Sequence, residues 1–164
     1  ILALSLWSLL QANHQAALRN NFKSTVANHV KAIQFGIDTY LEALHHIRSG
    51  FDASSFVDRD EFRILVERDA HRLPGIVALE WLPLIKHDDR AWLEQTTSNN
   101  TGHPFSFTDR DGDGALTTAA RRERYFPVHY AEPLNSNRFL LGYDPGGDAD
   151  RLAVLMRTAR EDRP

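Results

Sequence analysis

The feature that most constrains this fold is a long run of helix-forming residues, Gln11 to Arg48, which holds no proline and only one glycine, Gly36. Because helix interiors rarely contain breakers, the run predicts one long α-helix. Its apolar residues follow two interleaved seven-residue repeats: Val26, Ile33, Tyr40 and Ile47, and, offset by four, Val30, Ile37 and Leu44. This is the a/d stripe of a coiled coil. The helix is therefore expected either to pack on its own domain or to pair with a second copy in a dimer.

The first ten residues, ILALSLWSLL, are apolar apart from two serines. A membrane-spanning helix needs about 20 such residues. We interpret residues 1–10 as the outer end of a transmembrane helix, with Trp7 suited to the membrane interface. The alternative is an ordinary buried start of a helix or strand. The predicted organisation is thus a membrane end (1–10), a signalling and dimerisation helix (11–48) and a sensing domain (49–164).

Composition excludes several function classes. A length of 164 residues, a net charge of -3 and a pI near 6.2 indicate one domain without a basic surface for nucleic acid. The chain has no cysteine, which excludes thiolate catalysis, cysteine zinc sites and disulfides. It also lacks the sequence motifs of metalloproteases, serine hydrolases, P-loop enzymes and dinucleotide-binding enzymes. The sequence predicts no catalytic residue, no metal, no cofactor and no enzyme activity in this domain.

Local signals define the elements after the long helix, which is expected to end at Ser49-Gly50. Asp58 with Glu61 three residues later predicts a capping box and a second helix, which Pro74-Gly75 ends. Ile76 to Trp81 predicts a strand buried on both sides. Glu80 inside this strand is expected either to pair with an arginine or to line a pocket.

A short helix is expected from Asp88 to Thr97, with Trp92 and Leu93 facing inward. Alternation in Phe105 to Thr108 predicts a strand. The following Asp109 to Gly114 has the first half of an EF-hand loop, but Ala120 stands where the loop needs a glutamate. Two readings stay open: a hairpin turn, or a turn stiffened by calcium.

The stretch Arg124 to Asp144 contains two runs rich in aromatic and aliphatic residues, Tyr125 to Tyr130 and Arg138 to Tyr143, joined by a turn-rich link. This pattern predicts a β-hairpin that ends at Asp144. Asp148 then caps a helix from Ala149 to Glu161, whose inner face is Leu152, Leu155 and Met156. The predicted fold class is α+β.

Four segments in this order resemble the CHASE family, the extracytoplasmic sensing domain of membrane-bound histidine kinases, diguanylate cyclases and similar receptors. They are Ser54 to Phe62, Gly75 to Pro83 (GIVALEWLP), Tyr125 to Pro133 (YFPVHYAEP), and Leu141 to Asp144 (LGYD) with Asp148, Asp150, Arg151 and Ala153 after it. The resemblance spans residues 35–159. It implies a PAS-like antiparallel sheet after a long N-terminal helix, with further strands beyond Pro164 that complete the sheet.

The resemblance also implies a binding site. Asp144 matches the position at which a carboxylate in cytokinin-sensing members accepts hydrogen bonds from an adenine-type ring. A carboxylate suits this role because hydrogen bonds to a charged acceptor are stronger than those between neutral groups. The alternative role of Asp144 is to cap the turn Pro145-Gly146-Gly147. The candidate pocket walls are Trp81, Tyr125, Phe126, Leu141 and Tyr143, although aromatic residues in strands also make ordinary cores.

Two hypotheses for function follow. The first is a periplasmic or extracellular sensing domain of an inner or plasma membrane receptor, such as a two-component sensor histidine kinase or a diguanylate cyclase/phosphodiesterase. It would bind a small molecule, adenine-like or cytokinin-like, and act as a homodimer through its N-terminal helix. The second is a structural module that dimerises the receptor and binds no small molecule.

Overall fold

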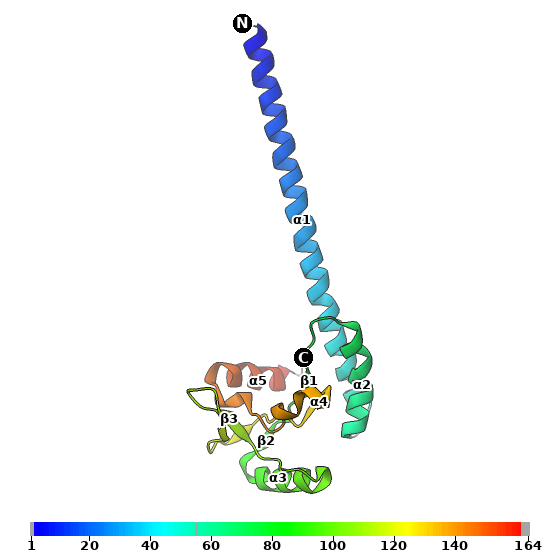
Figure 1. Cartoon of the computed structure of the whole chain (residues 1–164), viewed down its shortest axis with the longest axis vertical. Coiled ribbons are helices and arrows are strands. Elements are labelled where there is room, and N and C mark those ends of the chain that lie inside the picture. The colour runs from blue at the N-terminus through cyan, green and yellow to red at the C-terminus, as the bar shows by residue number, and fades with distance from the viewer. Residues whose placement is uncertain (1, 55, 162–164) are drawn as a thin grey trace. The chain divides into compact units, whose positions relative to one another are not determined.

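A computed structural model describes residues 2–54 and 56–161 (Figure 1). The chain divides into two compact units, residues 1–44 and residues 45–164. The long helix is confirmed as a single element, α1 (Leu2–Asp52). It ends a few residues later than predicted because Phe51 packs beside the apolar core of the second unit. Ser49 lies inside the helix, where its hydroxyl donates to the backbone oxygen of His45 over 2.9 Å.

Helix α2 (Arg59–Arg72) begins with the predicted capping box. The backbone N–H of Glu61 donates to the Asp58 carboxylate over 2.9 Å, and the Glu61 carboxylate accepts from the Asp58 N–H over 3.1 Å. This start aims the apolar face of α2 at the first core of the second unit. That core contains the buried residues Ile47, Val57, Phe62, Val66, Leu79 and Tyr130.

The strands of the described residues pair into three two-stranded antiparallel sheets. β1 (Leu79–Trp81) pairs with β6 (Tyr130–Glu132), β2 (Ile85–Lys86) with β5 (Arg124–Tyr125), and β3 (Thr108–Arg110) with β4 (Leu116–Thr118). A long N-terminal helix followed by helices and small antiparallel sheets confirms the α+β class.

The hairpin predicted over residues 124–144 is wrong. Its first half is divided between β5 and β6, which pair with β2 and β1 instead. Its second half forms α4 (Leu134–Asn137) and a 3₁₀ turn, η1 (Arg138–Leu140). The backbones of the two halves meet at Val128, which donates to the oxygen of Tyr143 and accepts from the N–H of Gly142, each over 2.9 Å. Pairing with strands far earlier in the chain therefore replaces the local hairpin.

The first predicted strand is shorter than expected. Ile76 donates its N–H to the Leu73 oxygen in a turn, so pairing begins only at Leu79. Val77 is 79% exposed and Trp81 is 36% exposed, so the expectation of burial on both sides of this strand is wrong.

Helix α3 (His87–Thr101) covers a second core made of Phe105, Phe107, Ala119 and Tyr125. Leu93 packs against this core as predicted, whereas Trp92 is 66% exposed. Adjacent residues on a helix lie about 100° apart, so only one of the two faces the core. Phe105 and Phe107 are buried and Ser106 is exposed, but the strand itself begins at Thr108.

The hairpin turn between β3 and β4 is confirmed. The Asp111 carboxylate accepts hydrogen bonds from the N–H groups of Asp113 and Ala115, over 3.0 and 2.9 Å. Gly114 has a φ of +83°, which favours glycine at the end of the turn. Two backbone N–H groups thus bind the Asp111 carboxylate within the turn.

The chain continues through the turn η2 (Pro145–Gly147) into α5 (Ala149–Glu161). Asp148 caps α5 as predicted by accepting from the N–H of Arg151 over 2.9 Å. The predicted inner face, Leu152, Leu155 and Met156, is only half-buried, and no described residue of α5 is buried. Helix α5 lies next to η2 (Figure 1). Asp144, just before η2, donates its backbone N–H to the oxygen of Thr108 in β3 over 2.8 Å.

Candidate functional site

Asp144 is wholly enclosed by protein groups, with 1% of its surface exposed. Its Oδ1 accepts from the N–H of Gly146 over 2.7 Å and from the N–H of Phe126 over 3.1 Å. Its Oδ2 accepts from Nη2 of Arg122 over 2.7 Å. The side chain therefore caps the η2 turn, which is the second of the two predicted roles, and also joins this turn to β5 through Phe126.

Arg122 is the centre of this polar cluster. Its guanidinium binds both carboxylate oxygens of Asp109 over 2.7 Å each and also reaches Asp144. Asp109 accepts a further bond from the N–H of Ala120 over 2.9 Å. Burial acts to raise the pKa of Asp109, but the bonds from Arg122 and Ala120 outweigh it and hold this pKa below its usual range. Arg122 thereby links the β3–β4 hairpin to the η2 turn.

Tyr125 fills the space between two arginines. Its ring centroid lies 5.2 Å from the guanidinium carbon of Arg90 and 5.1 Å from that of Arg122. Its hydroxyl accepts from the backbone N–H of Arg122 over 2.9 Å and lies 3.1 Å from Nδ1 of His87. The residue has no exposed surface, so it forms part of the second core.

Residues 55–164 match the model of the CHASE domain. The chain belongs to the CHASE domain family. CHASE domains are extracytoplasmic domains of membrane receptors. Their role is sensing rather than catalysis. No match was found among curated proteins.

In residues 2–54 and 56–161 of the chain, no helix has a stretch long and apolar enough to cross a membrane. Residues 1–10, which we interpret as a membrane end, fall at the start of α1, and the side chains of residues 1–6 and 8–10 lie outside the part that the structure describes.

The structure brings some of the predicted site residues of the CHASE domain together. Phe126 is buried and bonded to Asp144, and Leu141 packs on the core around Tyr125. Trp81 lies apart from them, on β1, where it stacks on Phe51 with ring centroids 4.2 Å apart. These residues therefore belong to two different surroundings.

Tyr143 has contacts that sequence reasoning missed. The guanidinium carbon of Arg110 lies 5.2 Å from its ring centroid, and Nη1 of Arg151 lies 3.4 Å from its hydroxyl. Arg122 was also missed, because it stands in the charged stretch RRER, in which nothing distinguishes it from its neighbours. Only the fold selects it as the partner of two carboxylates.

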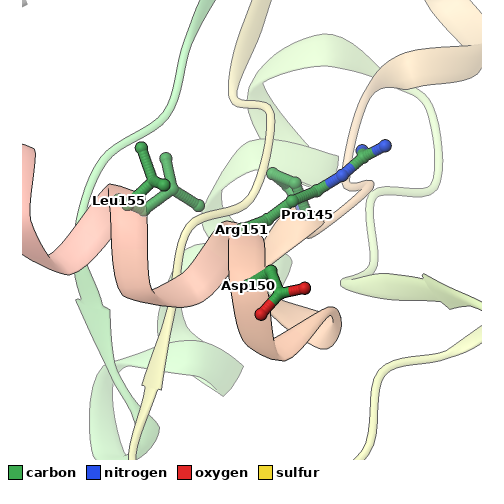
Figure 2. Close-up of a pocket in the computed structure, with 5 residues that line it drawn as sticks. Pro145, Asp150, Arg151 and Leu155 are labelled. Atoms are coloured by element: carbon green, nitrogen blue, oxygen red, sulfur yellow. The ribbon is translucent and has the colours of Figure 1, made fainter.

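A groove of about 380 Å³ lies along α5, and one of its lining residues, Arg151, reaches the hydroxyl of Tyr143. It is lined by Pro145, Asp150, Arg151, Val154 and Leu155 (Figure 2). We call it the α5 groove. None of the six predicted site residues lines it, but Pro145 directly follows Asp144 in the chain. The sequence assigned Leu155 to the inner face of the helix. In the structure Leu155 is only partly buried, and it lines the groove.

Two further ionisable groups have perturbed pKa values. Burial lowers the pKa of His129 to about 4, with a smaller contribution from the charge of Arg59, and Nδ1 of His129 is buried without a hydrogen-bond partner among the described residues. Burial raises the pKa of Glu80. The arginine partner expected for Glu80 is not found among the described residues.

Proposed function

We propose that this CHASE domain binds a small molecule outside the cytoplasm and passes the binding event to its receptor through α1. The observation that carries the proposal is the position of Ile47. It belongs to the heptad stripe of α1, and it is buried with Phe62, Leu79 and Tyr130 in the first core. A change in that core alters the surroundings of one residue of the stripe, so the core and the helix are expected to respond together.

The upstream part of the same stripe supports a homodimer. Its members Val26, Val30, Ile33, Ile37, Tyr40 and Leu44 are 37–65% exposed. An exposed a/d stripe of this composition is completed by the same stripe of a second helix. The proposed partner is a second copy of the chain, paired through α1.

The proposed setting is the periplasmic or extracellular side of an inner or plasma membrane receptor, with residues 1–10 as the end of a transmembrane helix. The proposed output is a cytoplasmic sensor histidine kinase or a diguanylate cyclase/phosphodiesterase. A PAS-like sheet is the proposed architecture of the complete sensing domain. The family and its membrane receptors support this setting.

An adenine-like or cytokinin-like ligand at Asp144 is the proposed ligand of the sensor. The carboxylate is already suited to planar N–H donors, because it accepts from the guanidinium of Arg122. Both of its oxygens are occupied, so such a ligand must take the place of Arg122. Tyr125, Phe126, Leu141 and Tyr143 are proposed as the walls nearest to it, and Trp81 as a more distant one.

The test is a thermal unfolding screen of the full chain with adenine derivatives and other planar metabolites. A ligand at 100 times its dissociation constant adds about 2.7 kcal/mol of stability. Asp144→Ala is expected to abolish this gain. Asp148→Ala is the matched control, because it removes an aspartate cap at α5 and leaves Asp144 in place. A gain that survives in Asp144→Ala contradicts the proposed anchor.

A second candidate function is a dimerisation module that binds no small molecule. The complete set of protein partners around Asp144 favours it. It predicts that no compound in the screen raises the unfolding temperature. It also predicts that Asp144→Ala lowers stability by the same amount whether or not a compound is added.

A further inference from the structure

Two arginines meet at Tyr143, at the edge of the α5 groove. Arg110 lies over the ring and Arg151 lies at the hydroxyl. Arg110 also donates a 2.9 Å hydrogen bond from Nη1 to the backbone oxygen of Gly114. Within the described part of the chain, neither arginine forms an ion pair. Arg90 and Arg122 do, at 2.9 and 2.7 Å, so the fold pairs its inner arginines and leaves these two available.

The groove next to these arginines is mainly apolar. Pro145, Val154 and Leu155 supply its carbon surface, and Val154 is 52% exposed although it is aliphatic. Figure 2 shows that Arg151 and Asp150 leave α5 in different directions, so the guanidinium is not neutralised by its neighbour. An apolar surface with one charged group at its edge suits a ligand that has both an apolar body and an opposite charge.

We propose that the α5 groove binds a small amphipathic carboxylate. Its apolar body would cover Pro145, Val154 and Leu155, and its carboxylate would accept hydrogen bonds from Arg151, with Arg110 adding positive charge across Tyr143. This inference rests on the proposed sensing function and adds a second ligand class to it, at a site other than Asp144.

The charges on the two sides of the groove decide the sign of the ligand. Among the described residues that line it, Asp150 is the one acidic side chain, against Arg151 in the lining and Arg110 beyond it. A guanidinium binds a carboxylate through two parallel N–H donors, which makes the pair both strong and oriented. A cationic ligand would instead meet two positive charges at the same edge.

The groove is connected to the polar cluster by the chain itself. Tyr143 and Pro145 are the immediate neighbours of Asp144, which Arg122 holds. A ligand that fixes Arg151 and Pro145 therefore stiffens the residues on both sides of Asp144. This gives the groove a route to the second core through Phe126, which is bonded to Asp144 and directly follows the core residue Tyr125.

The experiment is isothermal titration of the full chain with naphthalene-1-acetate and decanoate, each beside its primary amide. The amides keep the apolar body and remove the charge. We expect both acids to bind at least tenfold tighter than their amides, and added salt to narrow the difference. Equal binding of acid and amide overturns the carboxylate assignment, and absence of binding by both acids overturns the site.

Three variants locate the binding. Arg151→Gln is expected to weaken acid binding about tenfold, whereas Asp150→Asn is expected to strengthen it because a like charge is removed. Arg160→Gln, on the same helix but outside the groove lining, is the control and should leave the affinity unchanged. An unchanged affinity in Arg151→Gln, or an equal loss in Arg160→Gln, contradicts the proposal.

The outcome separates this inference from the proposed function. If adenine derivatives stabilise the chain through Asp144 and the acids do not bind, the sensor proposal stands and the groove assignment fails. If the acids bind through Arg151 and adenine derivatives do not bind, the sensing function and the groove assignment stand, and the adenine-like ligand at Asp144 fails. If neither class binds, both proposals fail together.

Discussion

The ring of Phe51, at the end of α1, stacks on the ring of Trp81 in β1, with centroids 4.2 Å apart and an angle of 23° between the rings. Phe51 also meets Phe62 of α2 edge to face at 6.1 Å. The last turn of the long helix is therefore fixed to the first sheet through aromatic contacts. Such pairs contribute about 0.5–1.5 kcal/mol beyond the area that they bury.

Phe51→Ala is expected to lower the free energy of unfolding by about 2 kcal/mol, because it removes both ring contacts and part of a core side chain. In a background with Trp7→Phe and Trp92→Phe, the emission of Trp81 should shift to the red as its stacked partner is lost. Fluorescence spectra and urea unfolding measure the two effects. Phe56→Ala is the control, since Phe56 is 71% exposed. An unshifted spectrum in Phe51→Ala contradicts the stacked geometry in solution.

Dimerisation through α1 predicts that one charge in the stripe separates the two copies. Ile37→Asp places a carboxylate at the centre of the proposed interface, where its burial opposes association. We expect the dissociation constant of the dimer to rise at least a hundredfold, as measured by analytical ultracentrifugation.

Phe35→Asp is the matched control for the dimer. Phe35 is 75% exposed and lies two positions from Ile37, which places it about 200° around the helix. The two variants have the same charge change on the same helix, so they differ only in the face that they alter. If both or neither of them dissociate the protein, the stripe is not the interface.

Arg122→Lys is expected to destabilise the domain by about 3 kcal/mol, although the charge is kept. A lysine cannot reproduce the two parallel bonds to Asp109 together with the bond to Asp144, so at least one largely buried carboxylate loses its partner. Chemical unfolding monitors the change. Arg63→Lys, at a pair whose arginine is 48% exposed, is the control and should cost less than 0.5 kcal/mol. Equal costs for the two variants would show that the cluster contributes little.

The parts of the fold that the sequence predicted well depend on partners close along the chain. The capping box joins Asp58 to Glu61, and Asp148 caps the N–H three residues later. The long helix follows from its composition alone. In each case the residues that interact lie within one or two turns, so a local pattern carries the information.

The parts that were missed depend on partners far along the chain. Residues 130–132 pair with residues 79–81, so a hairpin with residues 138–143 loses the competition although its local pattern is good. Arg122 binds carboxylates 13 and 22 residues away. Arg151 of α5 and Arg110 of the β3–β4 hairpin meet at Tyr143, although they lie 41 residues apart in the chain. No local signal indicates which of these distant partners meet.

His129 predicts a loss of stability in mild acid. Its ring lies between Phe105, 5.7 Å away, and Tyr130, 4.5 Å away, and burial lowers its pKa to about 4. In the unfolded chain the pKa of a histidine is about 6.5. Between these two values the unfolded state binds one more proton than the folded state, so stability is complete above pH 6.5 and falls as the pH decreases toward 4.

The expected slope from His129 is about 1 kcal/mol per pH unit in that window, somewhat below the limit of 1.36 for one proton because the ring is only partly buried. His129→Phe should flatten the dependence of unfolding free energy on pH between 6.5 and 4, as urea titrations at several pH values can measure. His103→Phe, at an exposed position, is the control and should keep the wild-type slope. If the wild-type and His129→Phe slopes coincide, the ring is not held neutral in the folded domain.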